Sequence, residues 1–287
     1  MIRIVEVGPR DGLQNEPKTI PTEIKVAFVD ALSRARLPEI EVSAFVSPKW
    51  VPQLADAAAV FARIARVPGV VYSALVPNLQ GFERALEAKA DRVAVFTAAS
   101  EGFNRRNINA TIEESIARFV PVIERARAAK LPVRGYVSTA FWCPYEGKVA
   151  PARVAEVVRR LFDAGVEEVS IGDTIGKAVP EEVRALLDVL LAGGPAARLA
   201  MHFHDTYGHA VENVMESWRR GIETFDASTG GLGGCPYAPG ASGNVATEAV
   251  VKALAAAGAK VDVDLAALAQ ARRGIAAALG RALAEPV

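Results

Sequence analysis

The sequence predicts an α/β protein that folds as a single (β/α)8 barrel. Short β-branched segments alternate with longer amphipathic segments along the whole chain, which is typical of strand–helix units in a parallel sheet. Eight such units fit into 287 residues, close to the roughly 250 of a barrel of this kind. An open doubly wound sheet is the alternative, but the segment after the first strand, Gly8-Pro9-Arg10-Asp11-Gly12, lacks the glycine pattern of a dinucleotide-binding turn.

The first half of the chain is expected to supply four of the units. Their strands are recognised by β-branched and apolar residues at 2–7, 39–42, 70–75 and 92–96. Their helices are recognised by apolar residues spaced three and four apart, at 22–36, 54–65, 82–88 and 112–129. Glu113 and Glu114 fall in the first turn of the fourth helix, where the helix dipole favours acidic side chains.

The second half repeats the pattern. Strands are expected at 133–138, 168–171, 199–203 and 224–227. Helices are expected at 152–163, 181–191, 210–219 and 245–257, and a last helix at 265–283. No linker or low-complexity stretch divides the chain, so we expect one catalytic domain over residues 1–287, with the barrel at about 1–257 and a short helical extension at about 258–287.

Composition narrows the function class. The 33 basic and 33 acidic residues cancel, so no charge pattern suggests binding to nucleic acid or to an anionic membrane. No apolar stretch reaches the roughly 18 residues of a membrane span. Two cysteines do not make a disulfide framework, and no targeting segment is recognisable, so we expect a cytoplasmic protein. A homo-oligomer remains possible.

All three histidines lie within the segment Met201-His202-Phe203-His204-Asp205-Thr206-Tyr207-Gly208-His209. His202 and His204 end an expected strand two residues apart, so their side chains point to the same face. A pair of imidazoles on one face can bind a divalent cation. Interior histidines in ordinary hydrogen bonds are the alternative. His209 is out of phase with the pair, and we expect it at the surface or behind the ligands.

Further polar residues follow other strands, at the barrel end where active sites of this fold lie. They are Arg10 and Asp11 after the first strand, Glu41 in the second, Asp173 after the sixth, and a glycine-rich segment, 229–244, after the eighth. Asp11 with the two histidines makes a ligand set that leaves positions open for substrate. Asn244 would add an oxygen ligand and favour Mg²⁺ or Mn²⁺ over zinc.

The remaining strand-end residues suggest chemistry around a cation. In an extended turn, Arg10 would diverge from Asp11 and could stabilise an oxyanion or enolate. Glu41 could orient Arg10 or a bound water, and Asp173, Thr174 and Tyr136 could position ligands or substrate. Structural ion pairs are an equally simple explanation for Arg10, Glu41 and Asp173.

The two cysteines differ in their surroundings. Cys235 lies in the glycine-rich segment, which suits a mobile loop whose thiol transfers a proton. Cys143 has no such surroundings, and we expect it to serve packing. An inert small residue in a turn is the alternative for Cys235.

Several long motifs resemble those of the 3-hydroxy-3-methylglutaryl-CoA lyase family, in register from about residue 2 to 254. They are Val5-Glu6-Val7-Gly8-Pro9-Arg10-Asp11-Gly12-Leu13-Gln14-Asn15-Glu16, Phe45-Val46-Ser47-Pro48-Lys49-Trp50-Val51-Pro52-Gln53, Asn107-Ile108-Asn109, Cys143-Pro144-Tyr145-Glu146-Gly147-Lys148, Gly172-Asp173-Thr174-Ile175-Gly176, His202-Phe203-His204-Asp205-Thr206-Tyr207-Gly208 and Gly231-Leu232-Gly233-Gly234-Cys235-Pro236-Tyr237-Ala238.

The resemblance implies a metal-dependent retro-Claisen cleavage of 3-hydroxy-3-methylglutaryl-CoA to acetyl-CoA and acetoacetate, as in leucine catabolism. It implies Asp11, His202, His204 and Asn244 as ligands of the cation. It also implies that Arg10 stabilises the enolate, that Cys235 transfers a proton, and that Glu41 is required. From the chemistry, Asp11 is the expected base for the C3 hydroxyl.

Two departures from the family pattern bear on the substrate. Pro17 follows Glu16 where several members have a lysine, so Lys18 could meet a CoA phosphate from a shifted position. Phe141-Trp142 replaces small residues before Cys143, which puts the C3 side chain of the substrate in doubt. Lysines and arginines that could meet the CoA phosphates, or could equally be solvated surface charges, are Lys18, Lys49, Arg105, Arg106 and Lys148.

Three alternatives are also compatible with the sequence. A related lyase would act on a longer-chain 3-hydroxyglutaryl-CoA. A Claisen-type synthase of the same superfamily would share the metal ligands, although the Gly-Leu-Gly-Gly-Cys-Pro-Tyr loop favours a lyase. A non-catalytic binding protein on a barrel scaffold would be expected to lack some of the residues that this sequence retains.

Overall fold

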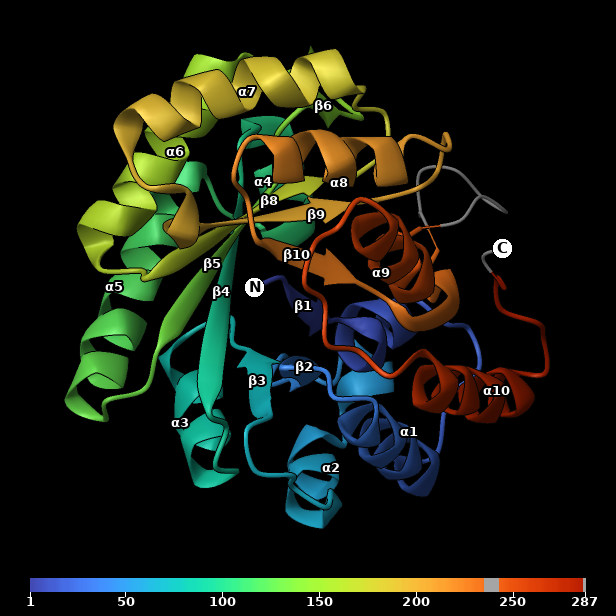
Figure 1. The fold of residues 1–287 in the computed structure, drawn as a ribbon. Coiled ribbons are helices and arrows are strands. Elements are labelled where there is room, and N and C mark those ends of the chain that lie inside the picture. The colour runs from blue at the N-terminus through green and yellow to red at the C-terminus, as the bar shows by residue number, and fades with distance from the viewer. Residues whose placement is uncertain (235–242, 286–287) are drawn as a thin grey trace.

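Eight parallel strands close into a barrel in the computed structural model, which describes residues 1–234 and 243–285 (Figure 1). Around the barrel, neighbouring strands follow the order β1, β2, β3, β4, β5, β8, β9, β10 and back to β1. Their bounds are β1 Arg3–Glu6, β2 Glu39–Ala44, β3 Val71–Leu75, β4 Arg92–Ala98, β5 Val133–Ser138, β8 Glu168–Asp173, β9 Leu199–Phe203 and β10 Thr224–Ala227. The predicted fold class is confirmed.

One main helix follows each strand and covers the outside of the barrel (Figure 1). These helices are α1 Thr22–Arg34, α2 Ala57–Arg63, α3 Leu79–Glu87, α5 Ile112–Ala128, α6 Pro151–Ala164, α7 Pro180–Gly193, α8 Ala210–Arg219 and α9 Thr247–Ala256. The predicted helices match these within a few residues. In α5, Thr111 and Glu114 form a reciprocal capping box that fixes the first turn.

A helix and a two-stranded hairpin were not predicted, and both lie in the segments that follow strands. Helix α4, Glu101–Ile108, is mostly polar and therefore has little apolar periodicity, but the Ser100 side chain caps its start. The hairpin of β6, Trp142–Cys143, and β7, Gly147–Lys148, is too short to produce a recognisable pattern. Short helical turns also occur at Gly8–Gly12, Pro52–Leu54, Ala196–Arg198 and Thr229–Gly231.

The strands are buried on both faces, because helices cover the outside while side chains from the strands fill the inside. Every residue of β2, β8, β9 and β10 is buried. This two-sided burial explains why the strand segments are rich in apolar residues. It also means that each charged residue inside the barrel must have a partner there, since buried charges persist only when they are paired.

Beyond the barrel, α10 (Leu265–Leu279) packs against α1, as the adjacent ribbons show (Figure 1). Asp264 caps α10 through its side chain, and its backbone N–H donates to the carbonyl of Ala35 at 2.9 Å. Among the described residues, no helix combines the length and the apolar character that crossing a membrane requires.

Candidate metal centre and active site

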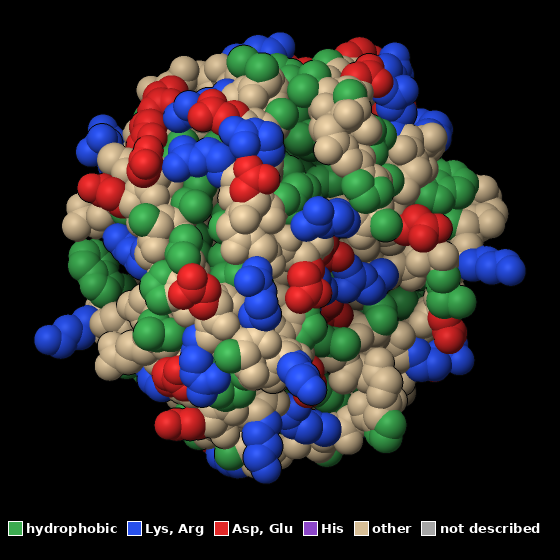
Figure 2. All heavy atoms as spheres, turned by 90° about the vertical axis from the view of Figure 1, so that its left-hand side faces the viewer, with side chains coloured by type: hydrophobic (Ala, Val, Ile, Leu, Met, Phe, Trp, Pro, Cys, Tyr) green, Lys and Arg blue, Asp and Glu red, His purple; other side chains and the backbone are tan. Residues whose placement is uncertain are grey.

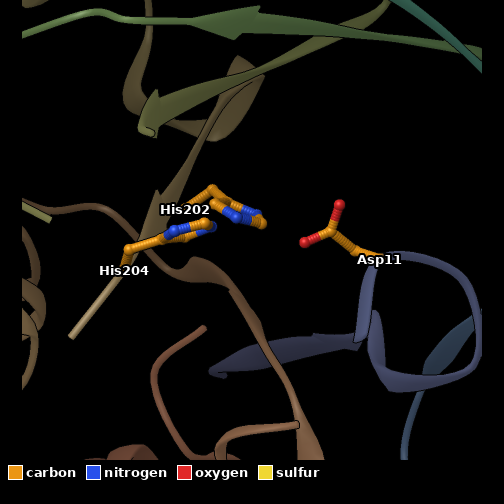
Figure 3. A group of neighbouring side chains, drawn as sticks. All are labelled: Asp11, His202 and His204. Atoms are coloured by element: carbon orange, nitrogen blue, oxygen red, sulfur yellow. The ribbon is translucent and has the colours of Figure 1, made fainter. Parts of the chain in front are cut away.

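Asp11, His202 and His204 converge at the carboxyl ends of the barrel strands. One ligand atom from each lies within 4.8 Å of the others. Figure 3 shows the Asp11 carboxylate, on the turn after β1, facing the two imidazoles, which come from the end of β9. The two imidazole centroids are 5.3 Å apart, so the pair shares one face as the strand periodicity predicts.

Asn244 joins this group from the segment between β10 and α9. Its Nδ2 donates to Oδ2 of Asp11 at 2.9 Å and to the carbonyl of Leu232 at 3.2 Å. The backbone of Asn244 also bridges to that of His204. The four predicted ligand residues are therefore brought together from three separate segments of the chain, and we call them the ligand group.

The donor set fits a divalent cation. In the described part of the chain, Nδ1 of His204 is buried and has no hydrogen-bond partner. Burial, followed by the neighbouring His202, lowers the pKa of His204 to about 4, so its imidazole is neutral near pH 7, as a metal ligand must be. Burial alone would raise the pKa of Asp11, but Arg10, His202 and His204 outweigh it and lower that pKa to about 2.

Arg10 lies beside this group and is held by two carboxylates. Its Nη1 is 2.5 Å from Oδ1 of Asp11, and its Nε is 2.6 Å from Oε2 of Glu41. The expectation that Arg10 and Asp11 diverge is wrong, because residues 8–12 form a helical turn instead of an extended one, which brings the two neighbouring side chains together. The guanidinium also lies over the Tyr136 ring, 5.4 Å from its centroid.

Other predicted residues surround the centre less directly. Tyr136 on β5 is buried, and its ring meets that of His202 edge-on at 6.5 Å. Asp173, the last residue of β8, accepts backbone N–H bonds from Lys177 and Ala178, so it organises its own loop. Thr174 accepts a hydrogen bond from the Thr139 N–H at 2.7 Å.

The lysines and arginines predicted for CoA lie on segments after β1, β2, β4 and β5, at the same end of the barrel. Lys18 donates to the carbonyl of Ala278 at 2.6 Å, and Lys148 pairs with Glu182 at 2.7 Å. Arg106 lies over the ring of Tyr145, 4.2 Å from its centroid. Lys49 and Arg105 are exposed. None of these contacts identifies a CoA site.

The other singled-out residues are His209 and the two cysteines. His209 is half-buried at the start of α8, 3.8 Å from Glu212, and is not part of the ligand group. Cys143 is buried in a small apolar cluster with Ala98 and Phe103, as expected of a packing residue. Cys235 lies outside the described residues.

Sequence reasoning missed Asp226, a fully buried carboxylate on β10. Its Oδ2 is 3.3 Å from Nδ1 of His202, and Arg134 on β5 binds its other oxygen at 2.6 Å. Asp226 and Arg134 belong to no motif, but a charged residue within a short strand of a barrel must be paired inside it. Applied to the predicted strands, this rule would have identified Asp226 and Arg134 as a buried pair.

The chain is similar to known proteins along almost its full length. The HMGL-like family model matches residues 1–275. A lyase of Pseudomonas aeruginosa named for 3-hydroxy-3-isohexenylglutaryl-CoA and hydroxy-methylglutaryl-CoA is 53% identical over 98% of this chain and 93% of its own length. The mitochondrial hydroxymethylglutaryl-CoA lyase of Rattus norvegicus is 51% identical over 98% of this chain and 86% of its own length.

A solved structure gives the same result in three dimensions. The crystal structure of hydroxymethylglutaryl-CoA lyase from Pseudomonas aeruginosa superimposes with a TM-score of 0.97 and 52% sequence identity, covering 99% of this chain and 95% of that one. With the closed barrel, the clustered ligands and full-length similarity of this order, the chain belongs to the HMGL-like family.

Proposed function

We propose that this protein is a carbon–carbon lyase that uses a divalent cation to split 3-hydroxy-3-methylglutaryl-CoA into acetyl-CoA and acetoacetate. The observation that carries the proposal is the convergence of Asp11, His202 and His204 with Arg10 directly beside them. The relatives' names supply the substrate class, an acyl-CoA with a 3-hydroxy group. The geometry of these four residues supports the proposal.

The residues that would hold the cation are Asp11, His202, His204 and Asn244. When bound, Mg²⁺ or Mn²⁺ would polarise the oxygens of the substrate and lower the pKa of its C3 hydroxyl. Two imidazoles with carboxylate and amide oxygens form a mixed set that suits these cations better than a closed zinc site does.

The protein's own side chains then handle charge and protons. We assign the removal of the C3 hydroxyl proton to Asp11, which lies beside the ligand group. As C3 becomes the ketone of acetoacetate, the electron pair of the C2–C3 bond passes to the thioester as an enolate. Arg10 offsets this negative charge. Because Glu41 and Asp11 already hold the Arg10 guanidinium in place, the side chain does not have to move when the enolate charge develops. The enolate carbon takes a proton, which we assign to Cys235.

A longer C3 side chain is a second candidate for the substrate. The Pseudomonas aeruginosa relative is named for an isohexenyl substrate as well as the methyl one. In this chain Trp142 follows Phe141 in the segment after β5, with its Nε1 donating to Glu182 at 3.0 Å and Lys177 over its ring at 4.0 Å. Comparing kcat/KM for methyl and isohexenyl substrates decides between the two.

We also propose a cytoplasmic setting and a possible homo-oligomer. The first follows from the two cysteines, which make no disulfide framework.

The function is tested by incubating purified protein with the methyl substrate and Mg²⁺ or Mn²⁺. We expect acetoacetate to form, and we expect EDTA to stop its formation until cation is restored. No acetoacetate with any tested cation would refute the substrate. Activity unchanged by EDTA would refute the role of the cation.

A further inference from the structure

A chain of buried ion pairs fills the inside of the barrel below the site. It begins at the opposite end, where Arg3 is partly exposed. Figure 2 shows the face on the left-hand side of Figure 1, where acidic and basic side chains lie next to one another at the surface. Successive N···O distances between the pairs range from 2.6 to 3.3 Å along the series Arg3, Glu39, Arg92, Glu168, Arg134 and Asp226.

Asp226, the last acid of this series, is hydrogen-bonded to His202, a predicted metal ligand. Oδ1 of Asp226 accepts from Nη2 of Arg134 at 2.6 Å. Oδ2 accepts from Oγ of Ser170 at 2.7 Å and lies 3.3 Å from Nδ1 of His202. Asp226, Arg134 and Ser170 are each at most 2% exposed, so water does not compete for these bonds.

This arrangement fixes which nitrogen of His202 carries the proton. The buried guanidinium of Arg134 pairs with Oδ1 of Asp226 at 2.6 Å, and a buried positive charge requires an ionised partner, so Asp226 is a carboxylate. A carboxylate can only accept hydrogen bonds, so Nδ1 of His202 must be the donor. Nε2 then remains as the nitrogen that can bind a cation.

We propose that Asp226, held in place by Arg134 and Ser170, is a positioning residue that sets the tautomer and ring orientation of His202 for cation binding. The inference rests on the proposed cation site, but it concerns the metal-free protein as well. His204 provides the internal contrast, because its Nδ1 has no hydrogen-bond partner among the described residues. The two ligands are therefore oriented by different means.

The substitution Asp226→Asn gives a sharp expectation. Arg134 requires an acceptor and would keep the amide oxygen of the new side chain, which turns the amide nitrogen toward His202. That nitrogen can only donate, so Nδ1 of His202 must accept and its proton must move to Nε2. The nitrogen that should bind the cation is then blocked by a proton.

Nitrogen-15 NMR of labelled histidine tests this in the metal-free protein at alkaline pH. Only three imidazoles contribute signals, and His209→Gln identifies the one that lies outside the ligand group. We expect His202 to carry its proton on Nδ1 in the parent and on Nε2 in Asp226→Asn. The same tautomer in both proteins would overturn the proposal.

Cation affinity gives a second readout that does not depend on turnover. We expect Asp226→Asn to weaken Mn²⁺ binding by about 10- to 100-fold, as measured by calorimetry. The matched control is Glu39→Gln, which removes an equally buried acid further along the series and is expected to cost stability with little loss of affinity. An equal loss of affinity in Glu39→Gln would overturn the proposal.

Ser170→Ala covers the case in which Asp226→Asn does not fold. It removes only the 2.7 Å bond to Oδ2, and we expect a smaller loss of Mn²⁺ affinity, of a few-fold, in a protein that folds as the parent does. Unchanged affinity in this variant would contradict the proposal. Failure of the parent to release acetoacetate would instead refute the proposed function and leave the tautomer result standing.

Discussion

Oε2 of Glu41 lies 2.6 Å from Nε of Arg10, and both side chains are almost completely buried. On its other side the same guanidinium pairs with Asp11, a member of the ligand group. Arg10 therefore connects an acid on β2 with the proposed cation site, and its orientation is set by the folded protein. Its position beside the cation site is the structural reason to expect that it stabilises an enolate.

Removing Glu41 should leave this buried positive charge less well compensated. For Glu41→Ala we expect a loss of stability of about 3 kcal/mol and a clear fall in kcat, because Arg10 loses one of its two anchors. Thermal unfolding and acetoacetate release measure the two effects. The control is Glu83→Ala, which breaks an exposed pair with Arg125 and should cost less than about 1 kcal/mol. Equal losses in both variants would contradict the account of Glu41.

Arg10→Lys should keep the positive charge but lose the forked geometry, since an ammonium cannot reproduce the bonds of Nε and Nη1 to two carboxylates. We expect kcat to fall by about 10²- to 10³-fold. Mn²⁺ affinity should change much less, because Arg10 is not a ligand. A variant with normal kcat would remove Arg10 from the reaction.

His204→Gln and His209→Gln form a matched pair of substitutions within one short segment of the chain. We expect His204→Gln to abolish measurable Mn²⁺ binding and turnover, because it removes a neutral imidazole from the ligand group. His209→Gln should leave both near the parent values, since His209 lies apart from that group. Calorimetry with Mn²⁺ distinguishes them, and loss of binding in both would be evidence against this assignment of ligands.

Because the carboxyl group of Asp173 is buried, we expect it to make the stability of the protein depend on pH. Burial raises its pKa to about 7 in the folded protein, whereas an exposed aspartate titrates near about 3.9. Between these values the folded state holds a proton that the unfolded chain has released, so the contribution of Asp173 to stability decreases as pH rises from about 4 to 7. Asp173→Asn does not titrate, and its Tm relative to the parent should therefore increase across this range. A constant difference in Tm would show that the carboxyl group is ionised throughout.

The barrel was predictable because its pattern is repeated and redundant. The eight strands are short, largely buried segments, and each is followed by a main helix with regular apolar spacing. Helix α4 escaped prediction because its stability comes from the Ser100 cap and from tertiary contacts of Phe103, neither of which is visible as periodicity.

The ligand group was predictable for a different reason. The fold places the residues that follow every strand at one end of the barrel, so the strand pattern alone predicts that Asp11 and His204 lie close together. The contacts between individual side chains, in contrast, cannot be predicted from the strand pattern. The ion pair of Arg10 with its neighbour Asp11 depends on a helical turn at residues 8–12, and the bond of Asp226 to His202 depends on how far each side chain reaches into the barrel.

The central claim, cleavage of the C2–C3 bond through an enolate, is tested most directly by proton NMR of the complete reaction in D₂O with Mg²⁺. We expect acetoacetate and acetyl-CoA in equal amounts, with one deuteron in the acetyl methyl group, because the enolate carbon takes its hydron from a group that exchanges with solvent. Free CoA with intact 3-hydroxy-3-methylglutarate, or no acetoacetate at all, would contradict it.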